Sequence, residues 1–167
     1  MPRDTSPRVF RSILCPVDFS SNSRAALRYA AMLARLSDAR LIVLYVNDPL
    51  LATVAAARPS AEAILAATEH DLRSFVRGAL HGTTPSVATT LLTIAGKPAE
   101  EIVRAAERHR CDVIVMGHRG AGRAARLLFG STTEGVVRMA AVPVLAVPVA
   151  RRRARLPSER RRLRRAS

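Results

Sequence analysis

The chain has 167 residues and a formal net charge of +14, with 49% hydrophobic and 24% charged residues. A chain of this length can bury a core of its own, so neither a disulfide framework nor a structural metal is needed. The composition excludes a chain disordered throughout and a membrane bundle. Because the first residues are charged and no apolar stretch reaches roughly 18 residues, we expect a cytoplasmic protein.

Most of the positive charge lies at one end of the sequence. Residues 151–167 hold nine arginines and one glutamate, a net charge of +8, which leaves +6 on residues 1–150. Such a run attracts polyanions without sequence specificity, but a solvated tail with no ligand explains it equally, so both interpretations stay open. With four Phe, two Tyr and no Trp, the chain offers few platforms on which single-stranded bases stack.

The pattern of apolar residues predicts five strands separated by helices. Short apolar runs bounded by turn residues indicate strands of a sheet covered on both faces. These runs cover residues 9–17, 41–46, 87–94, 112–116 and 142–147. Helical segments are expected around residues 26–34, 64–79 and 99–106, and in a short stretch that ends near residue 141. This alternation predicts a mostly parallel α/β sheet with right-handed crossovers and helices on both faces.

Individual residues refine this prediction. Ser20 to Ser23 offer N-caps for the first helix, and Pro98 suits the first turn of the third. Pro143 and Pro148 cannot donate to a ladder, so the last strand is expected at a sheet edge. An unpaired edge favours a homodimer through that strand, although the same prolines could instead protect a monomer.

The two cysteines are expected to be reduced core residues. Cys15 lies near the carboxyl end of the first strand, and Cys111 precedes the start of the fourth. Neighbouring parallel strands would therefore hold them several residues apart, at about 3.3 Å each, which exceeds the reach of a disulfide.

Candidate ligand-binding residues follow the strands, because open parallel sheets bind ligands beyond the carboxyl ends of their strands. Asp18 follows the first strand, and Asn47 and Asp48 follow the second. For Asp18, recognition of a base or ribose competes with a simpler role in capping the next helix.

A glycine-rich segment over 117–130 follows the fourth strand and leads into the start of the last helix. Its glycines allow close backbone approach and positive φ angles, and free N–H groups at a helix start favour phosphate. The competing interpretation is that Ser131 to Glu134 form a capping box. His118 in this segment is either a phosphate contact or a solvated loop residue, and Arg119, Arg123 and Arg126 are further phosphate candidates.

Two motifs resemble the universal stress protein family. Gly117-x2-Gly120-x9-Gly130-Ser131 is similar to its nucleotide-binding signature, and residues 13–20 (ILCPVDFS) resemble its first strand and acidic loop. Residues 143–147 also resemble its last strand. The resemblance implies a Rossmann-like fold of the adenine nucleotide alpha hydrolase type, an open five-stranded parallel sheet of order 3-2-1-4-5. It also implies ATP as ligand, with Mg²⁺ as a candidate companion, and a homodimer.

The resemblance divides the chain and assigns its site residues. It covers residues 9–149 as a nucleotide-binding domain, which leaves an N-terminal extension over 1–8 and an arginine-rich tail over 150–167 that we expect to be disordered. It implies that an adenosine site is lined by Pro16, Val17, Asp18 and the backbone of Val46. It further implies that ribose and phosphates are held by Met116, Gly117, Gly120, Gly130, Ser131, Thr132 and Thr133.

Other chemistries find little support. The sequence has no P-loop and no nucleophile elbow, and a loose G-x-G-x-x-A match over 120–125 does not open the first strand–helix unit. No residue is specified as a catalytic base, so ATP hydrolysis is expected to be slow and incidental at most. The leading hypothesis is a stress-response regulator whose ATP occupancy tunes conformation or partner choice. The alternative is an adaptor tethered by its tail to nucleic acid or an anionic membrane.

Overall fold

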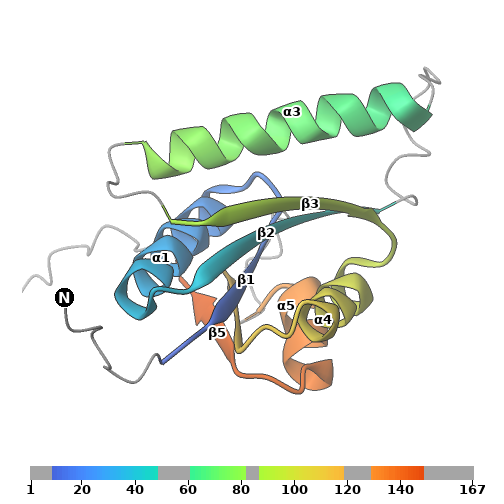
Figure 1. The fold of residues 1–167 in the computed structure, drawn as a ribbon. Helices are drawn as coiled ribbons and strands as arrows, with labels where there is room; N and C mark the ends of the chain where they lie inside the picture. The colour runs from blue at the N-terminus through green and yellow to red at the C-terminus, as the bar shows by residue number, and fades with distance from the viewer. Residues whose placement is uncertain (1–8, 49–60, 82–86, 119–128, 149–167) are drawn as a thin grey trace, which may run out of the picture.

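A computed structural model describes residues 9–48, 61–81, 87–118 and 129–148, and for residues 61–66 the backbone alone. The strands are β1 (Ser12–Val17), β2 (Arg40–Asn47), β3 (Thr89–Ala95), β4 (Val113–Gly117) and β5 (Val144–Val147). The helices are α1 (Ser21–Ser37), α3 (Ala61–Leu80), α4 (Pro98–Arg108) and α5 (Ser131–Met139) (Figure 1). The expected loop over 47–59, the helix end at Gly82 and Pro85, both termini and residues 119–128 lie wholly or largely outside the described residues.

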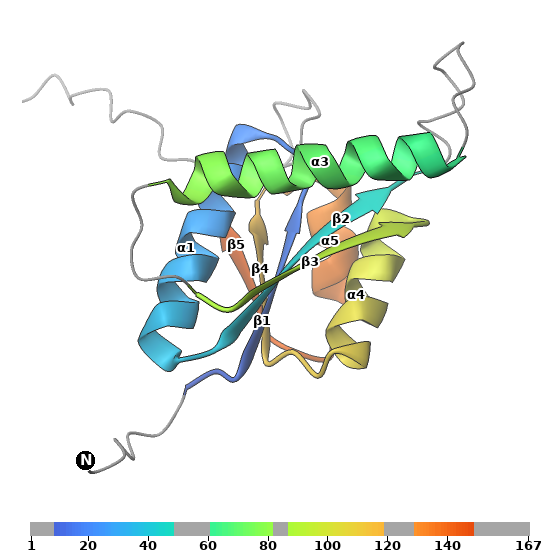
Figure 2. The ribbon, with the colours of Figure 1, turned by 45° about the horizontal axis from the view of Figure 1, so that its top comes forward.

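The strands form one parallel sheet of order β3-β2-β1-β4-β5. This confirms the predicted fold, including the edge position of the last strand. Figure 2 shows α1 on one side of the sheet and α4 and α5 on the other, with α3 lying across the α1 side. The winding direction reverses between β1 and β4, which are neighbours in space but lie far apart in the sequence.

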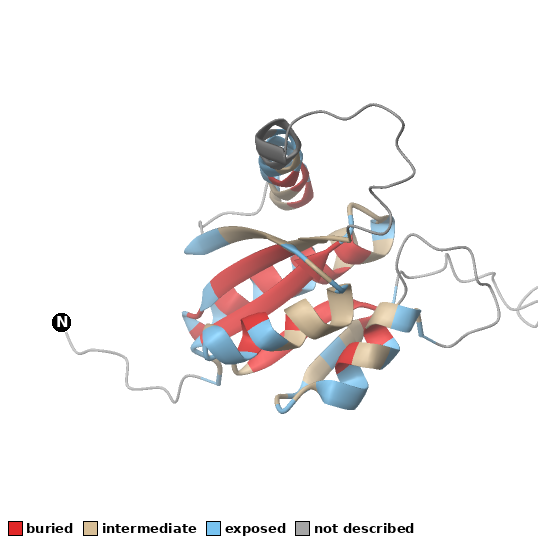
Figure 3. Ribbon diagram, turned by 90° about the vertical axis from the view of Figure 1, so that its right-hand side faces the viewer, coloured by how far each residue is buried: buried red, intermediate tan, exposed pale blue. Residues whose placement is uncertain are grey.

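The core has one layer on each face of the sheet, as the red strands between helices in Figure 3 show. On one face, Ile13, Cys15 and Val17 pack against α1 and α3, whereas Leu14 packs with α4 and α5 on the other. This alternation follows from the period of two along a strand. Burying each such aliphatic side chain contributes about 1.5–3 kcal/mol, so both faces stabilise the sheet.

Helices α1 and α4 begin at the residues that the sequence predicted as helix starts. Ser20 is the N-cap of α1, and its Oγ accepts a hydrogen bond from the Ser23 N–H at 3.1 Å. Pro98 occupies the first turn of α4, where its missing N–H leaves no intrahelical bond unmade. Gly96, just before this helix, has φ +152°, and a Cβ there would lie 2.7 Å from the Glu101 Cγ. A glycine is therefore required at the β3–α4 turn.

Strand boundaries differ from the predicted ones near their first residues. The first strand begins at Ser12, because the N–H groups of Arg11 and Ser12 bond to the Asp112 carboxylate, at 2.6 and 2.8 Å. The last strand begins at Val144, because Pro143 has no N–H and joins the ladder only through its carbonyl oxygen. The third strand covers 89–95, slightly later than expected.

Both cysteines are free and buried, as predicted. Ile13 pairs with Val113 in the β1–β4 ladder, so Cys15 and Cys111 are four positions out of register. They also belong to core layers on opposite faces. Within the parts of the chain that the structure describes, no helix is both long and apolar enough to cross a bilayer.

Candidate functional site

The carboxyl ends of β1 and β4 lie side by side, but their ladder stops early. The paired positions are Ile13 with Val113 and Leu14 with Ile114, although the strands continue to Val17 and Gly117. Continuing the register places Val17 level with Gly117. The structure therefore brings the ends of the first and fourth strands together, where the sequence placed a ligand.

Pro16 explains why the ladder stops. The N–H and C=O of Ser12 both face β4, where they bond to the side chain and the N–H of Asp112. Backbone polar groups alternate along a strand, so the nitrogen of residue 16 also faces β4 and has no hydrogen to donate. Proline in a central strand is unusual. Here it removes one donor from the β1–β4 ladder, whose pairing ends at Leu14 and Ile114.

Asp18 lies exposed directly after β1, in a tight turn before α1. Its Oδ1 accepts a hydrogen bond from the Ser20 N–H at 3.1 Å, so part of its role is to order the start of the helix. The next residue, Phe19, has φ +62°, a left-handed conformation that is uncommon for a bulky side chain and tends to mark functional turns.

An aromatic cluster, which the sequence did not reveal, supports this turn. Phe19 stacks on Tyr45 with ring centroids 4.7 Å apart and meets Phe75 of α3 edge-on at 5.4 Å. The Arg24 guanidinium lies 4.5 Å from the centre of the Phe75 ring. Burial, then the negative charges of Asp18 and another aspartate, raise the pKa of Tyr45. One local sign of this cluster is present in the sequence, the aromatic residue directly after Asp18. Its ring contacts join three segments that are distant in the sequence, so no spacing could predict them.

Three hydrogen bonds fix the end of β4, two of them to the start of α5 and one to β5. The buried Thr133 Oγ1 donates to the Gly117 carbonyl oxygen at 2.9 Å. The His118 N–H donates to the Val147 carbonyl, and the Gly130 N–H donates to the His118 carbonyl, both at 3.0 Å. The start of α5 is thus held at the carboxyl edge of the sheet, next to the end of β4.

The capping box, the competing interpretation of residues 131–134, is absent at this helix start. The N-cap is Gly130 rather than Ser131, and no side chain makes a capping hydrogen bond. Glu134 instead pairs with Arg138 at 2.8 Å. Gly130 has φ −71°, so it does not use the positive φ angles that glycine allows. Because glycine has no Cβ, Gly130 still lets a ligand approach the backbone closely at the helix start.

The other predicted site residues take different positions at this edge. Val17 and Met116 are buried in opposite core layers, Pro16 is buried, and Val46 is partly buried. Only their backbone groups suit a ligand at the strand ends. Ser131 is exposed and Thr132 is half-buried. The Thr133 hydroxyl already bonds to Gly117, so only the backbone N–H of Thr133 could bind a ligand. The carbonyl of the other candidate, Asn47, accepts the Gly96 N–H at 3.0 Å.

Gly120, the arginines at 119, 123 and 126, and the G-x-G-x-x-A match all lie outside the described residues. Within the described ranges, no group of three or more His, Cys, Asp or Glu side chains could hold a metal ion.

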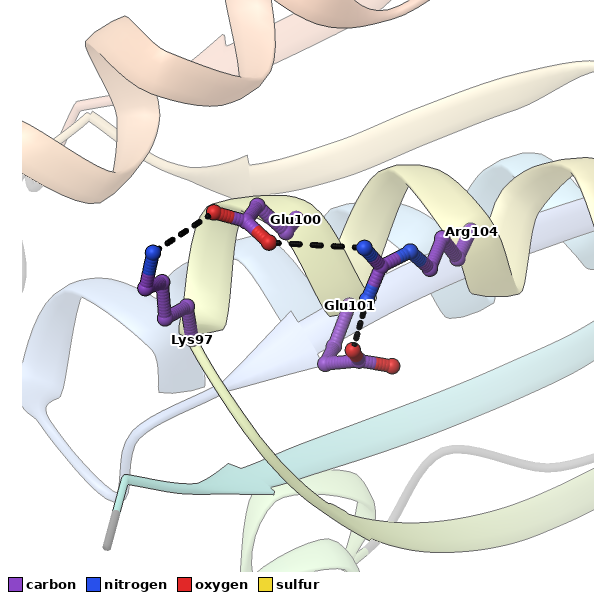
Figure 4. A network of polar contacts seen from close by, with 4 residues as sticks. All are labelled: Lys97, Glu100, Glu101 and Arg104. Carbon is purple, nitrogen blue, oxygen red and sulfur yellow. Dashed lines mark hydrogen bonds and ion pairs between the residues drawn. The ribbon is translucent and has the colours of Figure 1, made fainter.

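A network of ion pairs joins Lys97, just before α4, to three charged residues of α4 (Figure 4). Lys97 Nζ is 3.2 Å from Glu100 Oε1, and Arg104 pairs with Glu100 at 3.4 Å and with Glu101 at 2.5 Å. These are neighbours at helical spacing, mostly exposed, and such pairs contribute about 0.2–0.5 kcal/mol each. The network stabilises the helix surface and does not suggest a site.

The sequence matches the universal stress protein family over residues 10–148. The chain belongs to this family. Universal stress protein MJ0577 of Methanocaldococcus jannaschii is 28% identical over 158 residues, covering 83% of this chain and 95% of that protein. The universal stress protein in the QAH/OAS sulfhydrylase 3′ region of Thermus aquaticus is 32% identical over 139 residues, covering 83% and 99%.

Solved structures of universal stress proteins share the fold. The structure of MJ0577 gives a TM-score of 0.67 at 27% identity and covers 84% of this chain and 97% of that one. Two further structures, each 23% identical, contain cAMP in one case and dAMP in the other. At that identity the likeness shows the fold alone.

Proposed function

We propose that this universal stress protein binds ATP at the carboxyl ends of β1 and β4 and uses its occupancy to set conformation or partner choice. The observation that carries the proposal is the start of α5, which has no side-chain cap and is hydrogen-bonded to the end of β4 through Gly130 and Thr133. Free N–H groups and the helix dipole there favour an anion such as a phosphate chain.

The adenosine end of the proposed site lies at β1. Asp18 supplies a carboxylate one residue beyond Val17, which is level with Gly117, and the Ser20 N–H bonds to that carboxylate in the exposed turn. In this proposal Pro16, Val17, Val46, Met116 and Gly117 contribute backbone contacts. The phosphates contact the segment from Gly130 to Thr133, and Gly120 is assigned to them from the family signature.

The proposal does not include committed catalysis. Asp18 is the acidic residue that directly follows β1, and in this proposal it lies toward the nucleoside rather than the phosphates. Slow ATP hydrolysis would be incidental. If Mg²⁺ takes part, we expect it to enter with the phosphates of the nucleotide. A cytoplasmic location and the domain limits at residues 9 and 149 remain predictions.

Calorimetric titration of nucleotide-free protein with ATP and with inorganic triphosphate tests the proposal. Asp18→Asn should weaken ATP binding about tenfold or more, since hydrogen bonds to charged groups contribute about 1.5–3 kcal/mol. It should leave triphosphate binding unchanged. Asp38→Asn is the matched control, because Asp38 has φ 48°, which asparagine tolerates, at the far end of α1. Equal losses with ATP and triphosphate would remove Asp18 from the nucleoside site.

We also propose a homodimer through β5, the strand at one edge of the sheet. Leu145 on this strand is 41% exposed, although it is apolar. Exposed apolar residues also occur on both neighbouring helices, at Val137 and Met139 of α5 and at Tyr29 and Leu36 of α1. A twofold pairing of β5 would satisfy its free backbone groups and cover these side chains.

The alternative function, a polyanion-bound adaptor, depends on the charge of +8 in residues 151–167. If it holds, replacing the nine tail arginines with glutamine in the full chain should abolish retention on heparin at moderate salt. Unchanged retention would reject it.

A further inference from the structure

Phe19, the residue directly after Asp18, is held in an unfavourable backbone conformation. Its φ is +62°, a left-handed value that bulky side chains rarely adopt, because their Cβ crowds the following carbonyl oxygen. The Asp18 Oδ1 accepts its hydrogen bond from the Ser20 N–H, so this bond spans Phe19. The orientation of the Asp18 carboxylate therefore depends on the conformation of Phe19, and contacts elsewhere must hold that conformation.

Two aromatic rings from other elements hold the Phe19 side chain. Tyr45 of β2 stacks on it with ring centroids 4.7 Å apart, and Phe75 of α3 meets it edge-on at 5.4 Å. Both arrangements are favourable for aromatic pairs. The Phe19 ring therefore packs against the sheet and against α3, and the buried Phe75 is the contact on the helix.

The Phe75 ring is itself fixed by α1. The Arg24 guanidinium lies 4.5 Å from the ring centre, within the range of a cation–π contact. Gly78, one turn further along α3, leaves room for this side chain, since a Cβ there would lie 3.4 Å from Arg24 Nη1. Arg28 Nε donates a hydrogen bond to the Ala79 carbonyl at 3.0 Å. Two arginines from the first half of α1 thus hold Phe75 and the last turns of α3 in place.

The negative charge of Asp18 also acts on this aromatic cluster. Burial raises the pKa of Tyr45, and the charges of Asp18 and Asp71 raise it further. A carboxylate has this effect on a neighbouring hydroxyl only at short range. Asp18 is therefore a neighbour of the ring on which Phe19 stacks, in space as well as in the sequence.

We propose that Phe75 is a positioning residue for the nucleoside end of the site, which acts by holding Phe19 and, through it, the Asp18 carboxylate. This inference rests on the proposed function and adds to it a residue that does not touch the nucleotide. Phe75 lies on α3, outside the motifs that resemble the family. Without its ring the left-handed turn loses one of its two aromatic contacts, so the carboxylate is no longer held in one orientation.

Phe75→Leu removes the ring and keeps an apolar side chain of moderate size. We expect it to weaken the binding of ATP and of adenosine about fivefold, because part of the hydrogen bonding by Asp18 is lost. Binding of inorganic triphosphate should be unchanged. Affinities are measured by isothermal titration at a temperature at which circular dichroism shows each variant to be folded.

Leu72→Val is the matched control for a purely structural effect. Leu72 is buried one turn before Phe75 in the same core layer, and it makes neither of the ring contacts with Phe19. This variant should lower the melting temperature and leave the affinity for ATP unchanged. Equal losses of ATP affinity in Leu72→Val and Phe75→Leu would overturn the proposal.

A double-mutant cycle tests whether Phe75 acts through Asp18. Asp18→Ala leaves no carboxylate to orient, so adding Phe75→Leu to it should change ATP affinity by less than about twofold. Losses that multiply as independent effects would overturn the proposal. If Phe75→Leu does not fold, Phe75→Met replaces it in both experiments, because methionine fills the space of the ring with a flexible side chain.

Binding by the unsubstituted protein separates a failure of this role from a failure of the proposed function. If that protein binds no ATP, the proposed function is wrong and the positioning role falls with it. If it binds ATP, and Asp18→Ala weakens this binding but Phe75→Leu does not, the function stands and the role of Phe75 is wrong.

Discussion

Thr133→Val tests the hydrogen bond that joins the start of α5 to the end of β4. Thr133 is 2% exposed, and its hydroxyl donates to the buried Gly117 carbonyl at 2.9 Å. Valine has nearly the same shape, so it leaves no cavity but removes the donor. The carbonyl then stays buried without this partner, and we expect a loss of about 1–3 kcal/mol in the free energy of unfolding.

This loss is large enough to measure. In a chain of this size, 1 kcal/mol shifts the melting temperature by about 2–4 °C. Because the chain has no Trp, urea unfolding is best followed by far-UV circular dichroism. The adjacent Thr132→Val is the control, because Thr132 is half-buried and a substitution there should change stability by less than about 0.5 kcal/mol.

Equal stability of Thr133→Val and Thr132→Val would refute this reasoning, because it would show that the Thr133 hydroxyl does not hold α5 to β4. Thr133→Val should also weaken ATP binding, since the helix start would no longer be fixed beside Gly117. Full affinity in a destabilised variant would show that the phosphates do not depend on this junction.

Three other predictions concern stability and assembly. Gly96→Ala should destabilise the protein by about 1–3 kcal/mol, because φ is +152° and the new Cβ would lie 2.7 Å from a Glu101 side-chain atom. Gly78→Ala inside α3 should instead stabilise it by about 0.5–1 kcal/mol, and urea unfolding of both variants tests this contrast. Burial raises the pKa of Cys15, so the unfolded chain releases the thiol proton at a lower pH than the folded protein does. The free energy of unfolding should therefore fall as pH rises above about 8.5. Cys15→Ala should make this decrease smaller in urea titrations between pH 8 and 10. Leu145→Asp should convert the proposed dimer to monomer in sedimentation, whereas Thr90→Asp on the opposite edge strand should not. A dimer that survives Leu145→Asp would contradict pairing through β5.

The sequence predicted the parts of the fold that depend on local patterns. The apolar run over 41–46 lies inside β2, and Ser20 and Pro98 begin helices as their side-chain chemistry requires. Buried parallel strands, caps and prolines each leave a signal within a few residues. The position of the last strand at an edge also followed from its prolines.

Features that depend on register could not be predicted in this way. The effect of Pro16 arises because its nitrogen faces β4, which depends on how two distant strands pair. Ser131 to Glu134 fit a capping box, yet the Gly130 N–H bonds to His118, and the helix begins with Gly130 as its N-cap. Here a tertiary contact overrides a local preference.

The aromatic cluster illustrates the same limit. Phe19, Tyr45 and Phe75 come from a turn, a strand and a helix that are distant in the sequence, so no spacing indicates their contact. Their contacts begin at Phe19, the residue after Asp18, so the cluster packs beside the proposed nucleoside end.

Isothermal titration of nucleotide-free, full-length protein with ATP tests the central claim most directly. We predict saturable binding of one ATP per chain, with affinity that decreases from ATP to ADP to AMP as phosphates are removed from the start of α5. The absence of saturable heat up to millimolar ATP would contradict the claim. Equal affinity for ATP and adenosine would contradict the placement of phosphates at α5.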